Sequence, residues 1–334
     1  MSEPTKRRML DARDYTVGWI CANSADHVAA QEFLDEEHGR PEWRFPNDTN
    51  WYYLGAIGRH NIVLAVLPMG EYGTASAAGV AVNMLRSFPK ITIGLMVGIG
   101  GGAPLPPMRD IRLGDVVVGY PKNGSSGVFQ YDLGKRIQEK SFQHTRSLRQ
   151  PPQELLIALG KLKAQHEREG NRISEAVDEV LTKNPRLRRK YGRPPPKSDM
   201  LFKSNFVHHG GACLSSCGHD SSKIVQREPR IPGVDDDPAV HYGIIGSGNT
   251  LMKDALMRDL HATENNVLCF ETEAAGLMNL FPCLVIRGIC NYSDSHKSDE
   301  WHGFAAMSAA AYTKELLRSL VPEMARPERK MRPT

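Results

Sequence analysis

The sequence contains neither a long apolar run nor a secretory signal. No stretch of about 18 or more apolar residues occurs, so we expect no membrane-spanning helix. The N-terminus, MSEPTKRRMLDARDY, is charged and lacks the apolar core of a signal peptide. The 6 cysteines do not resemble a disulfide framework, and Cys269, Cys283 and Cys290 lie inside apolar runs. Reduced thiols and a cytoplasmic protein are therefore expected.

Motifs of several common enzyme classes are also missing. The glycine run at residues 98–102 is not a dinucleotide fingerprint, because Pro104 follows and no helix opens at once. The run also lacks the Lys-Ser/Thr pair of a P-loop, and no Gly-x-Ser-x-Gly elbow of a serine hydrolase occurs anywhere. The net charge of +4 is modest, and no basic, readable face indicates nucleic acid. We expect neither a cofactor nor a nucleic-acid or membrane partner.

What the sequence does contain is an alternation of strand-like and helix-like segments, which predicts an α/β fold. Several strand-like runs are continuously apolar, which is typical of a sheet covered on both faces. We expect a first helix capped by Ser24 and closed by Gly39. The expected strands include residues 15–22, two within 51–70, and 91–104, 110–121, 239–249, 267–270 and 283–290; further helices are expected at 70–89, 251–266 and 304–322.

A charged segment interrupts this pattern. Residues 135–204 are rich in charge and largely helical in pattern, and they contain a triple proline that predicts an extended spacer. We interpret them as an insertion on the surface of a single catalytic domain. The expected organisation is a disordered tail (1–13), the first part of the domain (14–134), the insertion (135–204), the second part (205–321) and a second tail (322–334).

Acidic residues follow three of the predicted strands. Asp26 comes after the first strand, Glu271 and Glu273 after a late strand, and Asp294 after the next. In open α/β sheets, ligands bind at the carboxyl ends of the strands. We therefore expect these carboxylates at one rim of the sheet, facing a ligand with hydroxyl groups.

A weaker candidate is a zinc site in the polar segment after residue 207. Two cysteines with three residues between them lie among histidines there, a spacing within the range of zinc sites. No second cysteine pair follows, so a polar loop without metal is the preferred interpretation. The candidate ligands are His208, His209, Cys213, Cys217 and His219.

Four motifs in order resemble the nucleoside phosphorylase and methylthioadenosine/adenosylhomocysteine nucleosidase superfamily. They are GLMVGIGGGAP with DIRLGDVVVG, YGIIGSGN, CFETEAAGLM and LVIRGICNYSDSH. The resemblance implies a three-layer α/β/α fold with a mixed, partly closed sheet, and cleavage of a purine N-glycosidic bond. It also implies a homo-oligomer.

The resemblance assigns roles to individual residues. Glu273 matches a carboxylate that binds the ribose hydroxyls, with Glu271 and Thr272 beside it. The acid that assists the leaving purine matches Asp294 in one alignment and Asn291 in another, and Asp294 is our preferred candidate. The remaining substrate-binding residues implied are Gly98, Gly100, Gly101, Phe129, Ser247 and Gly248.

The nucleophile distinguishes the two branches of this superfamily. Phosphorylases bind phosphate with arginines and a serine, and here the matching segments hold no arginine, while Ile99 replaces the serine. Nucleosidases place an acid after the first strand to activate water, and Asp26 matches that acid. Hydrolysis is therefore favoured over phosphorolysis. The substitutions Asp26, Thr272 and Asn291 leave a catalytically weak, nucleoside-sensing domain as a third interpretation.

Overall fold

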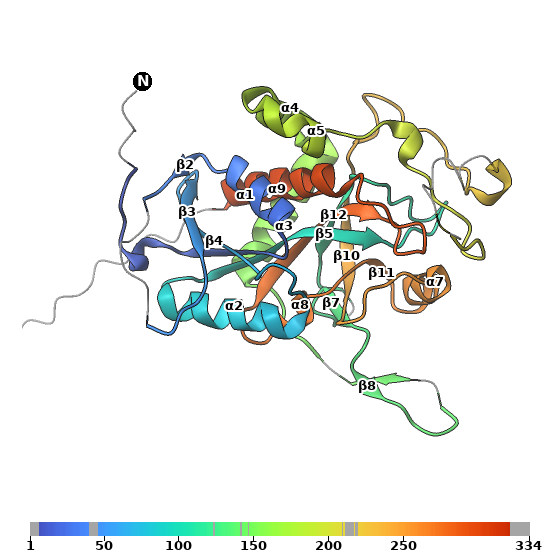
Figure 1. The fold of residues 1–334 in the computed structure, drawn as a ribbon, viewed down its shortest axis with the longest axis horizontal. Helices are drawn as coiled ribbons and strands as arrows, with labels where there is room; N and C mark the ends of the chain where they lie inside the picture. Colours follow the sequence, from blue (N-terminus) through green and yellow to red (C-terminus); the bar gives the residue numbers. More distant parts are fainter. Residues whose placement is uncertain are drawn as a thin grey trace, which may run out of the picture.

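The computed structural model describes residues 7–39, 46–122, 124–140, 142–145, 147–208, 210, 217 and 220–320. A mixed sheet of 10 strands forms the centre of the molecule (Figure 1). Its strands are β1 (Val17–Cys21), β2 (Glu36–Glu37), β3 (Tyr52–Ile57), β4 (His60–Val66), β5 (Ile93–Gly102), β6 (Val116–Gly119), β7 (Val128–Gln130), β10 (Val240–Ser247), β11 (Val267–Glu271) and β12 (Cys283–Asn291). A separate hairpin joins β8 (Gly134–Lys135) to β9 (Gln143–His144).

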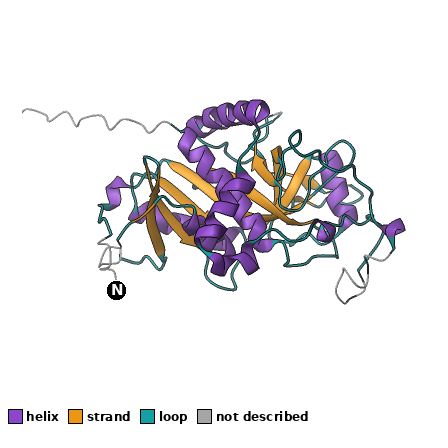
Figure 2. Cartoon of the chain, turned by 90° about the horizontal axis from the view of Figure 1, so that it is seen from above, coloured by secondary structure: helices purple, strands orange, loops and turns teal. Residues whose placement is uncertain are grey.

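Helices cover both faces of the sheet, as a view from above also shows (Figure 2). On one face, α1 and α9 pack together, and α9 lies against β5 and β12. On the other face lie α2 and α8, which also contact each other. The helices are α1 (Ser24–Glu32), α2 (Thr74–Ser87), α3 (Gln153–Glu169), α4 (Ile173–Lys183), α5 (Arg188–Tyr191), α7 (Ala255–Glu264), α8 (Ala274–Leu277) and α9 (His302–Ser319).

The sheet curls until it closes on itself at one end. The strand order runs β11-β10-β6-β12-β5-β1-β4-β3-β2, and β11 also pairs with β5 in antiparallel fashion. Strands β1 and β12 both run parallel to β5. This arrangement confirms the predicted three-layer α/β/α fold with a mixed, partly closed sheet. It also brings the ends of β1, β5, β11 and β12 into one region.

The predicted bounds of the first helix were wrong at both ends. Asn23, not Ser24, is the N-cap, and its Oδ1 accepts hydrogen bonds from the backbone N–H groups of Ala25 (2.8 Å) and Asp26 (3.0 Å). The helix ends at Glu32 rather than Gly39, because residues 36–37 pair with β3 as a short edge strand. Local helix signals extended across this segment, and a tertiary strand pairing overrode them.

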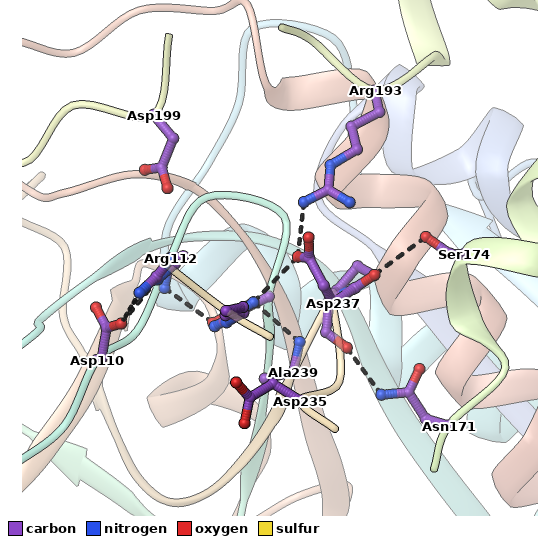
Figure 3. Close-up of polar contacts among 12 residues, drawn as sticks. Asp110, Arg112, Asn171, Ser174, Arg193, Asp199, Asp235, Asp237 and Ala239 are labelled. Atoms are coloured by element: carbon purple, nitrogen blue, oxygen red, sulfur yellow. Dashed lines mark hydrogen bonds and ion pairs between the residues drawn. The ribbon is translucent and has the colours of Figure 1, made fainter. Parts of the chain in front are cut away.

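The charged segment packs on the body of the domain. Helices α3 and α4 bury apolar stripes that include Leu159 and Val177, and both helices contact α9. A polar network then ties the segment to residues 235–239 (Figure 3). Asn171 Nδ2 donates to the carbonyl of Pro238 (2.8 Å), and Arg193 Nη2 pairs with Asp237 (2.6 Å).

Within the described part of the chain, no helix is long and apolar enough to cross a membrane.

Candidate active site

Asp26 lies in the first turn of α1, directly above the glycine run of β5. A Cβ built on Gly98 would lie 2.4 Å from Asp26 Oδ2 and 2.9 Å from Nη1 of Arg287. A side chain at position 98 would therefore displace either Asp26 or Arg287. Because Gly98 has no Cβ, the Asp26 carboxylate and the Arg287 guanidinium can both approach the backbone of β5 closely at this point.

Arg287 is the centre of a fully buried ion cluster. It is 0% exposed in the interior of β12, and its Nη2 forms an ion pair with Glu271 and lies 3.3 Å from Glu273 Oε2. Burial alone lowers the pKa of Arg287, but Glu271, Glu273 and Asp26 outweigh this and raise it. Arg287 is therefore charged at any physiological pH. A buried charge of this kind persists only when it is paired.

Asp26 is the least satisfied acid of the cluster. Its Oδ2 accepts a hydrogen bond from Asn23 Nδ2 (2.8 Å), whereas its buried Oδ1 has no hydrogen-bond partner in the described chain. Burial raises the pKa of Asp26 to about 7; the charge of Arg287 acts to lower it and that of Glu273 to raise it. A carboxylate that has a pKa near neutrality and one oxygen without a hydrogen-bond partner is suited to general base catalysis.

Glu271 and Glu273 have different structural positions although they are one residue apart. Glu271 accepts hydrogen bonds from the backbone N–H groups of Glu273 (3.0 Å) and Ala274 (3.0 Å), so it caps the short helix α8. Ser247 Oγ accepts the next N–H, from Ala275 (2.8 Å). Glu273 accepts hydrogen bonds from the Thr272 hydroxyl and from Arg287, so side chains rather than backbone N–H groups bind its carboxylate. These different hydrogen-bond partners support a structural role for Glu271.

A small pocket adjoins the cluster. Asn291 and Ser293, from the end of β12, face Gly101: a Cβ there would lie 2.7 Å from Asn291 Oδ1 and 2.1 Å from Ser293 Oγ. The pocket thus has one polar side and one apolar side. Its lining is Gly101, Tyr131, Leu251, Met252, Phe270, Glu271, Thr272, Ser293 and Lys297. A larger cleft of about 740 Å³, between α1, α3, α4 and α9, has a different lining that includes none of these residues.

Other residues singled out from the sequence lie beside this pocket rather than in its lining. Asp294 is buried with its Oδ2 3.8 Å from Arg258 Nη1 and 3.8 Å from His296 Nδ1. Phe129 packs against His144, with ring centroids 4.6 Å apart. At Gly248, an added Cβ would meet Asp132 (2.8 Å), so that glycine permits a close turn. Gly100 similarly allows the approach of Phe270 and Arg287.

Sequence reasoning missed the residue at the centre of the cluster. Arg287 interrupts the apolar run CLVIRGIC, and a charge inside a buried strand was the available signal. Tyr131, Phe270 and Lys297 carried no local signal, because the closure of the sheet brings them together. Of the zinc candidates, His209, Cys213 and His219 lie outside the described residues.

Comparisons with known proteins agree with this architecture, although no family model matches the chain. A nucleotide-binding leucine-rich repeat-like protein of Hyaloscypha variabilis is 42% identical over 324 residues, which are 97% of this chain and 31% of that protein. An ATP nucleosidase, Cap17, of Escherichia coli is 32% identical over 85 residues, 24% of this chain and 17% of the relative. The chain thus spans about a third or less of these relatives.

Solved structures resemble the whole fold. A methylthioadenosine/adenosylhomocysteine nucleosidase of Helicobacter pylori matches 92% of this chain and 99% of its own, with a TM-score of 0.57 and 14% identity. The corresponding nucleosidase of Neisseria meningitidis, in complex with methylthio-immucillin-A, matches 91% and 99%, with a TM-score of 0.57 and 17% identity. The futalosine hydrolase of H. pylori matches with a TM-score of 0.52. The chain therefore has the fold of these nucleosidases, which is the fold that the resemblance of its sequence motifs predicted.

Proposed function

We propose that this chain hydrolyses the N-glycosidic bond of a purine nucleoside. The observation that carries the proposal is the buried, unpaired Oδ1 of Asp26, an acid whose pKa lies near neutrality in a cluster with Arg287 and Glu273. Nucleosidase activity in the proteins of similar fold supports it. The name of Cap17 makes ATP a second substrate to test.

In this mechanism, a water beside Asp26 attacks C1′ of the ribose. Asp26 takes a proton from the water as the new C1′–O bond forms and the bond from C1′ to the purine nitrogen breaks. The purine leaves with the electron pair of that bond and is protonated by Asp294 or, where Asn291 faces it, by solvent water. Glu273 accepts hydrogen bonds from the 2′- and 3′-hydroxyls. Three acids surround one arginine, so the cluster is net negative when Asp26 is ionised and stabilises the positive charge that develops on the ribose.

Two residues remain candidates for the contact to the leaving purine. The position of Asn291 beside Gly101 of the pocket supports Asn291, whose amide can hydrogen-bond to the base but cannot supply a proton easily. Asp294, our preferred acid from the sequence, is one residue beyond Ser293 of the pocket but contacts Arg258 and His296. Substitutions at both positions distinguish them, as described in the Discussion.

The same cluster argues against phosphate as the nucleophile. Arg287 is already paired with Glu271 and Glu273, so a phosphate anion approaching Asp26 would meet uncompensated negative charge. Desolvating such an anion without a cationic partner is costly. We therefore keep phosphorolysis as the alternative and propose hydrolysis.

The test is phosphate dependence. Purified protein is incubated with adenosine, guanosine, methylthioadenosine and ATP, with and without inorganic phosphate, and free base and sugar products are measured. Release of base and ribose without phosphate supports hydrolysis. Strict phosphate dependence with ribose 1-phosphate as product would replace the proposal with a phosphorylase. Ligand-dependent thermal stabilisation without any base release would instead indicate a sensing domain.

A further inference from the structure

His208, Cys217 and His296 form a cluster at the end of residues 291–296, the elbow that follows β12. One potential ligand atom from each residue lies within 4.8 Å of those of the other two. Nδ1 of His208 is 3.2 Å from Sγ of Cys217, and both Cys217 and His296 are buried. His208 and Cys217 were weak zinc candidates in the sequence, whereas His296 comes from a distant segment.

The surrounding structure holds two of these residues in place. His296 is stacked on Phe202, with ring centroids 4.0 Å apart, and on Phe206 at 5.2 Å. The backbone N–H of His208 donates to Ser295 Oγ (2.9 Å), which attaches the chain at residue 208 to the elbow. A binding site built on such fixed side chains needs little rearrangement to accept an ion.

The spacing and chemistry of the cluster suit zinc. Zinc binds histidine nitrogen at about 2.0 Å and cysteine sulfur at about 2.3 Å, which places tetrahedral ligand atoms about 3.5 Å apart. The Nδ1 of His208 and the Sγ of Cys217 are 3.2 Å apart, and the ligand atoms of all three residues lie within 4.8 Å of one another, so small side-chain shifts bring them into this arrangement. The carboxylate of Asp294 lies 3.8 Å from Nδ1 of His296, and such a carboxylate commonly orients a metal-binding histidine.

We propose that His208, Cys217 and His296 bind a zinc ion that fastens the chain at His208 and at Cys217 to the elbow carrying Asn291 and Ser293. Three protein ligands leave the fourth tetrahedral position to water or another donor. None of its ligands lines the pocket, so the ion lies outside it and takes no part in the proposed reaction. Its role is to stabilise the elbow that carries Asn291 and Ser293.

The direct test measures metal content and uses no catalytic readout. The protein is purified without an affinity metal, loaded with zinc, dialysed and analysed by elemental mass spectrometry. We expect about one zinc per chain in the wild type. We expect the zinc content of Cys217→Ser and His208→Asn to fall at least about tenfold, because removing one ligand leaves only two.

The variant His296→Phe separates metal binding from packing. Phenylalanine preserves the stack on Phe202 and Phe206 but removes both ring nitrogens. His302→Ala is the matched control, since His302 lies in the same segment, is partly exposed and pairs with Asp299 (3.4 Å). We expect His296→Phe to lose zinc while keeping its circular dichroism spectrum, and His302→Ala to retain zinc.

Cobalt substitution identifies the ligands. A thiolate bound to cobalt gives a charge-transfer absorption band, which we expect in the wild type and not in Cys217→Ser. The proposal is overturned if zinc-loaded wild type retains no metal after dialysis. It is equally overturned if His296→Phe and Cys217→Ser bind as much zinc as the wild type.

Discussion

Asp26 Oδ2 and Arg287 Nη1 both lie within 3 Å of the position that a Cβ on Gly98 would occupy, at 2.4 Å and 2.9 Å. The two residues are far apart in the sequence, on α1 and β12, and meet because both β1 and β12 pair with β5. Gly98 therefore lets one cation and the proposed general base come close to the same point of β5.

Hydrolysis is expected to require ionised Asp26. Because burial raises the pKa of Asp26 to about 7, the carboxylate is protonated and inactive as a base below that pH. We expect kcat/KM to fall about tenfold for each pH unit below about 7 and to level off above it. A profile that stays flat from about pH 5 to about pH 8 would show that Asp26 is not the base.

The same residue makes stability depend on pH. Asp26 binds its proton more tightly in the folded protein than in the unfolded chain, where its pKa is near 3.8. The stability that this difference contributes is therefore lost as pH rises from 3.8 through about 7. We expect Asp26→Asn to melt at a higher temperature than the wild type at alkaline pH. The difference should shrink as the pH falls below 7. An equal difference at every pH would contradict the linkage.

Gly98→Ala is expected to abolish activity while leaving a folded protein. The added Cβ would clash with both Asp26 and Arg287 and would displace at least one of them from the cluster. We expect a loss of at least about 10²-fold in kcat, the size typical of removing a general base. Gly79→Ala is the control, because nothing lies within 4 Å of its added Cβ in helix α2. Equal activity in both variants would refute the assignment.

Asn291→Asp is expected to increase activity. If Asn291 faces the purine, the carboxylic acid of the variant donates the proton that an amide cannot donate. We expect the rate of base release to rise at least about tenfold. Asp294→Asn should then affect activity little. The opposite pattern, in which Asp294→Asn abolishes activity and Asn291→Asp has no effect, would assign the role to Asp294. Initial rates of base release measure both.

Arg230→Ala is expected to destabilise the fold strongly. Arg230 forms an ion pair with the fully buried Asp115 (2.6 Å), which also contacts His241 (2.8 Å). Removing the guanidinium leaves the carboxylate of Asp115 buried without this partner, which lowers the free energy of unfolding by about 3–5 kcal/mol. Arg193→Ala, at the more exposed end of the same network, should cost about 1 kcal/mol or less. Urea unfolding measures both, and equal losses would contradict this reasoning.

The pH dependence of that network has the opposite sign to that of Asp26. Burial alone would raise the pKa of Asp115, but hydrogen bonds and charge from His241 and Arg230 outweigh it and lower that pKa well below 3.8. The stability from Asp115 is therefore present above the unfolded pKa and lost as pH falls below it. We expect Arg230→Ala to be much less stable than the wild type at neutral pH, and the difference to narrow at acid pH.

Much of the fold could be predicted from the chain because its strands are continuous apolar runs. The strands at β1, β5 and β12 and the helix α9 lie where the hydrophobic pattern places them. The prediction failed at the end of α1, where residues 36–37 pair with β3. The homo-oligomer, the cytoplasmic location and the domain boundaries stay predictions.

The sequence by itself determined the residue types and their order: acids at the ends of strands, a glycine run in the last half of β5, and four motifs that resemble the superfamily. Only the tertiary structure decided which groups meet. Arg287 became the centre of the cluster, and His296 joined His208 and Cys217, because strand pairing and side-chain packing brought distant segments together. Local sequence patterns report periodicity within one element, whereas a site depends on the register between elements.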